Sequence, residues 1–533
     1  MKTNEIIVPF DVVLPASTII RAGDLTMLYE EGNLRNIKHG HIEIIRMIYP
    51  AIRNQHWQTA PYELQDEKVE LSEKGFMISY KAMYKFQELH YKAFCTIEGK
   101  QDNTIIFSFE GEALSPFLRN RIGLCVLHPV RECIGRKVII TGADGSLRHF
   151  EFPELISPHQ PFVDIRELQW ETEYGIKGTL VFEGDIFETE DQRNWTDSSF
   201  KTYSTALHLP YPVQVVTGQK TGQRVTLKVS LGASGIPGKK GSITEEKLSF
   251  PNIGYIWPQM EETTAEQINR LKKIPFHHCR IEVRFDKKDW QKEFSTACSQ
   301  IRQTGVPIEL IVFFEKANDA ELKELITEIE KPGIRVFSIL VLQNNHRCTP
   351  PVLMKSAYDS IKESFPSARV GYGTDEHFAE LNRNRPMDIP FDFVNFTIYP
   401  QVHNSDIRTI IENLENQADT LASAKIFIQG RPIHISPLLF NKSFNADPRL
   451  QSRFAALWTL IAIQNVSETE LITLDGSFIP DSGATPLYDL LLMISEFKPQ
   501  WIIRRYEDNE LLVNGLMLEN ADGERIFFTG LPK

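Results

Sequence analysis

Residues 183–203, EGDIFETEDQRNWTDSSFKTY, are the most informative stretch of this chain. Carboxylates, cations, an amide and two aromatic side chains crowd into it, whereas a strand that only has to fold alternates apolar and polar residues with little charge toward the core. Amides and charges bind hydroxyls, and an indole face covers C–H groups, so the mixture suits a sugar-like ligand. If residues 190–195 are extended, alternate side chains share a face, which puts Asp191, Arg193 and Trp195 on one side. The alternative is a surface hairpin whose charges pair with one another, but charges in a core or cleft must be paired or used.

The composition of the chain is that of an ordinary globular protein. Its 533 residues are enough for two to four domains, and 42% of them are hydrophobic and 24% charged. A formal net charge of −12 disfavours nonspecific contact with nucleic acid or an anionic membrane. No stretch approaches the roughly 18 uninterrupted apolar residues of a membrane span. We therefore expect a small-molecule ligand, no nucleic-acid or membrane partner, and an oligomeric state that the sequence leaves open.

The termini and cysteines indicate the compartment. The N-terminal segment contains Glu5, Asp11 and an early proline without a sustained apolar run, so it makes a poor signal peptide. The six cysteines are scattered and contain no C-x-x-C pair, which is typical of small core residues in a reducing compartment. We expect a cytoplasmic location, free cysteines and no zinc site.

The pattern of the sequence changes near residue 250. Before it, short segments rich in β-branched and aromatic residues recur between turn signals. After it, short apolar strands alternate with amphipathic helices in eight units, which fits a (β/α)₈ barrel whose functional groups lie just after the strands. The predicted fold class is α+β multidomain. It comprises a large antiparallel β-sandwich domain at 1–245, a TIM-like barrel at 250–496 and a small C-terminal β segment at 497–533.

Local signals place several boundaries. Glycine, proline and lysine cluster at 233–242, which is the best linker candidate. Thr264 and Gln267 are spaced for a capping box, and periodicity predicts helices over 351–364, 406–421 and 484–496. The C-terminal segment either forms a small terminal domain or adds strands to the N-terminal sandwich.

A β domain with a barrel resembles many glycoside hydrolases, so that chemistry is tested first. Retaining glycosidases need two carboxylates about 5–5.5 Å apart. The predicted fourth strand ends in Leu342–His346 and the seventh in His434–Pro437, and neither carries a carboxylate. There is also no nucleophile elbow, H-E-x-x-H motif or phosphate-binding glycine loop. An ordinary glycosidase is disfavoured.

Metal and cofactor signals are weak. His39 and His41 followed by Glu43 could share a strand face, but they lack a recognised ligand frame. We expect no organic cofactor and assign no metal ligands. Whether the protein needs a divalent metal ion stays open, because carboxylate-rich sites can hold one.

Several motifs together make the chain similar to a known family, the D-apionate lactonases of bacterial apiose breakdown. The strongest match is EDQRNWTD at 190–197, continuing as FKTY at 200–203. Further matches lie at 34–37, 46–49, 53–57, 120–123, 127–129, 152–162, 380–386 and 400–403. The resemblance implies a β domain, a barrel and a small C-terminal domain. It also implies opening of the lactone of a branched aldonic acid.

Lactone hydrolysis needs a base for water, a cation or donor for the oxyanion, and donors for the ring hydroxyls. We expect Glu190 or Asp191 to be the base and Arg193 or Lys201 to stabilise the oxyanion. His128 is a second candidate for proton transfer, as is His159, and for both histidines a structural hydrogen bond is the alternative. The expected substrate-binding residues are Asn194, Trp195, Tyr203, His159, Arg53, Glu183, Asp375, Glu376 and His403.

Two placements and three functions remain open. We favour chemistry on the β domain, while Asp375 and Glu376 after the fifth strand and His403 after the sixth mark the barrel mouth as the alternative. The favoured function is hydrolysis of a sugar-acid lactone, most simply D-apionolactone. The rivals are a glycoside hydrolase-like enzyme acting on plant-derived carbohydrate and a noncatalytic sugar-binding or mutarotase-like protein.

Overall fold

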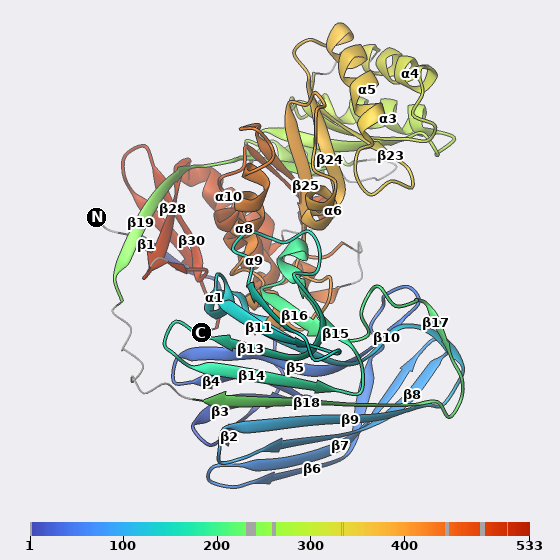
Figure 1. Ribbon diagram of the computed structural model, residues 1–533. Coiled ribbons are helices and arrows are strands. Elements are labelled where there is room, and N and C mark those ends of the chain that lie inside the picture. Colours follow the sequence, from blue (N-terminus) through green and yellow to red (C-terminus); the bar gives the residue numbers. More distant parts are fainter. Residues whose placement is uncertain are drawn as a thin grey trace. The chain divides into compact units, whose positions relative to one another are not determined.

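The structure is a computed structural model that describes residues 3–230, 241–257, 263–331, 333, 335–442, 447–479, 485–508 and 510–532 (Figure 1). Its contacts group the chain into two compact units. The barrel unit comprises Met1–Val13, Asn194–Asp197 and Lys240–Lys533, and the β unit comprises Leu14–Arg193 and Ser198–Lys239. Most of the predicted linker, residues 233–240, lies outside the described residues.

The described residues of the β unit form an antiparallel sheet of 17 strands, in agreement with the large antiparallel β domain that the sequence predicts. Its first strands are β2 (Thr18–Ala22), β3 (Leu25–Glu30), β4 (Asn33–His39), β5 (Ile42–Asn54), β6 (Tyr62–Leu71), β7 (Phe76–Phe86), β8 (Leu89–Gly99), β9 (Thr104–Ala113) and β10 (Phe117–Pro129). After the short helix α1 (Val130–Cys133) follow β11 (Lys137–Gly142), β12 (Leu147–Glu151), β13 (Phe162–Glu171), β14 (Lys177–Glu183), β15 (Phe187–Asp191), β16 (Ser199–Tyr203), β17 (Val213–Val215) and β18 (Lys220–Ser230).

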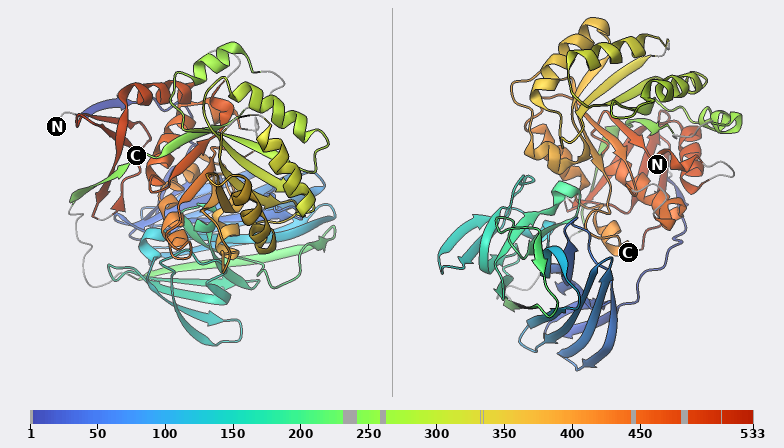
Figure 2. Two further views of the ribbon diagram at one scale, coloured as in Figure 1. Left: turned by 90° about the horizontal axis from the view of Figure 1, so that it is seen from above. Right: turned by 90° about the vertical axis from the view of Figure 1, so that its right-hand side faces the viewer.

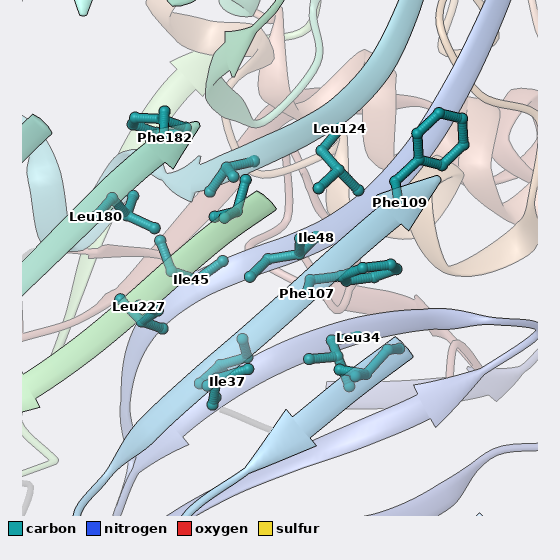
Figure 3. Packing of buried hydrophobic residues seen from close by; sticks show 14 of the residues in the cluster. Leu34, Ile37, Ile45, Ile48, Phe107, Phe109, Leu124, Leu180, Phe182 and Leu227 are labelled. Carbon is teal, nitrogen blue, oxygen red and sulfur yellow. The ribbon is translucent and has the colours of Figure 1, made fainter. Parts of the chain in front are cut away.

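Alternation of apolar and polar residues builds the core of this unit. Along β7 and β8, buried positions alternate with more exposed ones, because successive side chains of a strand point to opposite faces. The inward side chains form one cluster that includes Ile45, Phe107 and Leu124 (Figure 3). Full burial of one such side chain contributes about 1.5–3 kcal/mol, so this cluster fixes the sheet on which polar side chains can be displayed.

Eight parallel strands close into a barrel in the other unit, which confirms the predicted (β/α)₈ architecture. They are β20 (Asn252–Ile256), β21 (His278–Arg284), β22 (Ile308–Phe314), β23 (Val336–Gln343), β24 (Arg369–His377), β25 (Phe393–Ile398), β26 (Ile433–Leu438) and β27 (Leu471–Leu474). The helices are α2 (Ala265–Leu271), α3 (Trp290–Ile301), α4 (Asp319–Glu330), α5 (Pro351–Ser364), α6 (Phe378–Arg383), α7 (Ile407–Glu412), α8 (Gln417–Lys425), α9 (Arg453–Asn465) and α10 (Pro486–Phe497). Figure 2 shows the green and yellow helices lying outside the strands.

The helix signals in the sequence are mostly confirmed. Thr264 and Gln267 form the expected capping box at the start of α2, and α5 has the predicted bounds. The helix predicted over 406–421 is instead split into α7 and α8. Residues 413–416 form a turn between them, and the Asn413 side chain at the end of α7 donates to Asp197 and to the Pro400 carbonyl. None of the described helices is both long and apolar enough to cross a membrane.

The C-terminal strands pair with two strands from earlier in the chain. Strands β28 (Pro499–Glu507), β29 (Glu510–Leu511), β30 (Gly515–Asn520) and β31 (Arg525–Thr529) share a six-stranded sheet with β1 (Thr3–Ile7) and β19 (Ile243–Ser249). Figure 1 shows blue β1 and green β19 beside the red strands. The C-terminal strands therefore do not extend the β unit, and Thr3–Ile7 groups with the barrel rather than with the predicted 1–245 domain.

The barrel interior is polar near its first strand. Gly254 is in register with His278 on one side and Thr473 on the other. The His278 Nε2 atom lies 2.8 Å from Thr473 Oγ1, and that hydroxyl donates to Glu309 Oε2 over 2.6 Å. A Cβ atom on Gly254 would lie 2.2 Å from His278 Nε2, so the glycine makes room for the imidazole.

We expect Gly254→Ala to lower the free energy of unfolding by about 1–3 kcal/mol, because overpacking displaces His278 and its hydrogen bonds. Urea unfolding followed by circular dichroism measures the change. Gly222→Ala is the matched control, since a Cβ there meets no heavy atom within 4 Å. Equal midpoints for the two variants would contradict the packing argument.

Candidate active site

The most informative stretch of the sequence is divided between the two units. Strand β15 ends at Asp191, a 3₁₀ turn spans Gln192–Trp195, and β16 begins at Ser199. The condition that residues 190–195 are extended is therefore met only as far as Asp191. Asp191 Oδ1 accepts from the backbone N–H of Arg193 over 3.2 Å, a local bond that turns the chain. Residues 194–197 group with the barrel, while both flanking strands belong to the β unit.

Asp197 forms a hydrogen-bonded pair with His403, which follows β25. The His403 Nδ1 atom bonds to Asp197 Oδ2. The other carboxylate oxygen accepts from Asn413 Nδ2 over 2.7 Å, and the same amide donates to the Pro400 carbonyl over 3.0 Å. A neutral imidazole that donates Nδ1–H to a carboxylate carries its lone pair on Nε2. The geometry is that of a general base held by an acidic partner.

The other residues of the segment are also fixed by the barrel unit. Trp195 packs edge-on against His403 with ring centroids 5.2 Å apart, and the Arg383 guanidinium lies 5.1 Å from the indole centroid. Asn382 Nδ2 donates to Asn194 Oδ1 over 3.1 Å. The sequence-predicted residues Asn194, Trp195 and His403 are thus brought together in one unit.

Asp375 and Glu376, near the end of β24, have different surroundings. Asp375 accepts from Arg280 Nη2 over 2.5 Å. Burial raises the pKa of its carboxyl, although Arg280 opposes the shift. Glu376 pairs with Lys442, and both side chains are partly exposed. The Lys442–Glu376 pair therefore offers charges that a ligand can reach.

The sequence did not single out His377, the last residue of β24. Its ring lies 3.9 Å from the Tyr399 ring, and neither ring nitrogen has a hydrogen-bond partner among the described residues. Burial lowers its pKa well below the ordinary value, with Lys442 and His403 adding to the shift. His377 is therefore a neutral donor and acceptor at physiological pH. Its position directly after Glu376 is the sequence signal that could have identified it. Asn413, the partner of Asp197, has no such signal in the sequence.

The Asp191–Arg193 pair has the geometry of a structural ion pair. Arg193 Nε and Nη2 donate to the two oxygens of Asp191 over 2.9 and 2.8 Å, and both side chains are 0% exposed. Further donation from Arg193 goes to the carbonyls of Pro153 and Glu154. Such a saturated, buried pair favours a role in holding the turn after β15.

Glu190, Lys201 and Tyr203 share one face of the sheet in the β unit. Glu190 is in register with Lys201, whose ammonium donates to Glu190 Oε1 over 3.3 Å and lies 5.0 Å from the Tyr203 ring centroid. The Tyr203 hydroxyl donates to Glu188 Oε1 over 2.6 Å, and burial raises the pKa of Glu188. These predicted residues do come together, in a unit other than that of His403.

The remaining predicted residues lie elsewhere in the β unit. His128 is fully buried against Phe152 and Trp170, and its Nε2 lies 2.8 Å from Thr202 Oγ1. Burial lowers its pKa to about 3, which favours the structural alternative for this residue. His159 and Glu183 are exposed, and Arg53 is buried on β5.

The possible metal ligands and the cysteines were both considered among the described residues. Among those residues, no group of three or more histidine, cysteine, aspartate or glutamate side chains is arranged to hold a metal ion. All six cysteines are buried and free, as the sequence predicted.

We expect Asp191→Asn to lower the free energy of unfolding by about 3–5 kcal/mol, because it leaves the Arg193 guanidinium buried without its charge partner. Glu183→Gln is the control. It breaks a 3.8 Å ion pair with Arg224 whose side chains are both 55% exposed, and such pairs contribute about 1 kcal/mol or less. Urea unfolding compares the two. A folded, fully stable Asp191→Asn protein that loses turnover would instead make Asp191 part of the chemistry.

Among solved structures, two glycosidases align with part of this chain. A glucosidase from Croceicoccus marinus aligns with a TM-score of 0.36 at 11% identity, over 54% of this chain and 74% of that one. A family 51 α-L-arabinofuranosidase from Bifidobacterium longum aligns with a TM-score of 0.36 at 8% identity, over 53% and 83%. Likeness at this level carries no functional argument.

The sequence comparisons are more specific. Two family models, for the N-terminal domain and the TIM barrel domain of D-apionate lactonase, match residues 9–231 and 253–446. A curated D-apionate lactonase of Brucella anthropi is 29% identical over 442 residues, which are 79% of this chain and 72% of that protein. The matches include the segment that carries Asn194–Asp197 and the barrel strands that position His377 and His403. This chain belongs to the D-apionate lactonase family.

Proposed function

We propose that this chain is a carboxylic-ester hydrolase that opens a sugar-acid lactone, with D-apionolactone as the first candidate substrate and D-apionate as its product. The name of the curated relative and the matching domain models support the reaction class. The observation that carries the chemistry is the Asp197–His403 pair at the carboxyl end of barrel strand β25. Functional groups of TIM barrels lie at this end of the strands.

In the proposed reaction, His403 Nε2 takes a proton from water while the water oxygen bonds to the lactone carbonyl carbon. The carbonyl π electrons move onto oxygen, and the resulting imidazolium is stabilised by the Asp197 carboxylate. Collapse of the tetrahedral intermediate breaks the bond to the ring oxygen, which takes the proton back from Nε2. The balance is lactone plus water giving a hydroxy acid, which ionises at neutral pH.

Charge that develops on the carbonyl oxygen needs a cation or a donor. Lys442 is the candidate for this role, because its ammonium is 5.8 Å from the Tyr399 ring centroid and, like His403, it lowers the pKa of the buried His377. Burial raises the pKa of Tyr399, so its phenol stays protonated and can donate. Trp195 offers an indole face for the C–H groups of the polyol.

This assignment moves the base from Glu190 or Asp191, the sequence-based candidates, to His403. Asp191 is saturated by Arg193, and Glu190 is engaged by Lys201. His403 with its carboxylate partner is the arrangement that water activation requires. No metal enters the proposed steps, so metal dependence is part of the test.

We expect a pH-stat assay over a panel of aldonolactones to show acid release well above the spontaneous rate, fastest with D-apionolactone, and unchanged by prolonged treatment with a chelator. Loss of activity in the chelator arm would reveal an essential labile metal. Nitrophenol release from aryl glycosides at a useful rate would favour the glycoside hydrolase rival. Binding in calorimetry without acid release would favour a noncatalytic sugar-binding protein.

We expect His403→Gln and Asp197→Asn each to lower kcat by about 10²- to 10⁴-fold, the range that general-base catalysis contributes. Glu190→Gln and Glu376→Gln, assayed in parallel, distinguish an active site in the β unit from one at the barrel mouth. A larger loss of turnover in Glu190→Gln than in His403→Gln, with all variants folded by circular dichroism, would return the base to the β unit.

A further inference from the structure

Arg121 presents an unoccupied hydrogen-bonding edge in the β unit. It lies on β10, in register with Arg53 of β5, and is 4% exposed. Its Nη1 atom donates to the Asn120 carbonyl over 2.6 Å. Among the described residues, its Nε and Nη2 atoms have no hydrogen-bond partner. These two atoms form the side of a guanidinium that donates two parallel bonds to a carboxylate.

Two other arginines of the chain fill both positions of this edge with a carboxylate. Arg193 donates from Nε and Nη2 to the two oxygens of Asp191 over 2.9 and 2.8 Å. Arg449 does the same with Asp447, over 2.9 and 2.6 Å. A buried guanidinium with two unpaired N–H groups is costly. At Arg121 the unpaired edge has the geometry that a carboxylate matches.

Two aromatic side chains flank the guanidinium. Its carbon lies 5.2 Å from the Trp57 ring centroid and 5.0 Å from that of Tyr211. The two rings meet edge to face at 5.3 Å and are 39% and 46% exposed. Exposed aromatic faces beside a cation suit a ligand that carries C–H groups next to a negative charge.

The backbone holds Trp57 in a strained conformation. Its φ is +64°, in the left-handed region that a bulky residue rarely adopts. The turn is maintained by Asn54, whose Oδ1 accepts from the backbone N–H groups of His56 and Gln58 over 3.0 Å each. Strain of this kind persists where the surrounding structure imposes it, commonly at ligand sites.

Side chains that can bind the hydroxyl groups of a ligand lie on the same face of the sheet as Arg121. Burial lowers the pKa of Arg121, while Tyr203, Glu188 and Tyr211 act in the opposite direction. The Glu188 carboxylate accepts from the Tyr203 hydroxyl over 2.6 Å and from the Leu207 backbone N–H over 2.8 Å, which partly offsets its charge. Gln160 Nε2 lies 3.5 Å from the same hydroxyl.

We propose that Arg121 binds the carboxylate of an open-chain sugar acid through Nε and Nη2, with Trp57 and Tyr211 covering its C–H groups. The choice of a sugar acid rests on the proposed function, because hydrolysis of a lactone releases such an acid. A neutral lactone has no carboxylate for this edge. The site therefore distinguishes the acid from the lactone.

Isothermal titration calorimetry on the full chain tests this with D-gluconate and with the acid released from the best lactone of the panel. Sorbitol is the neutral comparator. We expect both acids to bind, sorbitol not to bind, and Arg121→Gln to raise the Kd at least tenfold. Arg119→Gln removes the same charge two residues away on β10 and is expected to change the Kd by less than twofold. Equal Kd values in folded Arg121→Gln and wild-type protein would overturn the proposal.

A second measurement covers the case in which Arg121→Gln fails to fold. Arg121→Lys keeps the charge but lacks the paired N–H groups, and we expect it to lose the affinity for gluconate as well. In the wild-type protein, ¹H–¹⁵N spectra of arginine Nε–H groups should show one signal that shifts with gluconate and is absent in Arg121→Lys. No such signal would overturn the proposal. Lactone hydrolysis without acid binding would contradict the proposed acid site and leave the proposed function intact. Acid binding without hydrolysis would contradict the proposed function and leave the acid site intact.

Discussion

The hydrogen bonds of the Asp197 carboxylate organise the candidate active site. One oxygen bonds to His403, 206 residues further along the chain, and the other accepts from Asn413. Because a short segment of the β-rich half supplies this carboxylate, Asn194–Asp197 groups with the barrel while its flanks do not. The Asp197 side chain, which holds His403 in one tautomer, therefore also fixes the path of the backbone at Asn194–Asp197.

The barrel places charged groups in its interior, where they must be satisfied. Glu309 accepts from Ser436 and Thr473 over 2.7 and 2.6 Å, and Arg280 bonds to Ser436 and Asp375. In a medium of low dielectric constant an unpaired polar group is costly. Among the described residues, Glu309 and Arg280 each keep one buried polar atom without a partner, whereas both ring nitrogens of His377 lack one.

The sequence predicted much of the architecture because local rules decide it. Periodicity located all eight barrel strands, and the Thr264 capping box has the expected geometry. The same rules did not foresee that β1 and β19 would pair with the C-terminal strands, since pairing between distant segments depends on which edges remain open. They also did not foresee the turn after Asp191, because the side-chain bond that makes it looks like an ordinary charge in an extended run.

For the candidate site, the sequence by itself determined the residue types: a dense polar segment at 190–203, histidines after barrel strands, and motifs shared with one family. The tertiary structure alone decided which of them meet. Asp191 and Arg193 turned inward to saturate each other, Asp197 reached His403, and Arg121 kept a buried edge without a partner among the described residues. The reason is physical: hydrogen bonds act over about 3 Å, a proximity that sequence spacing does not encode for residues hundreds of positions apart.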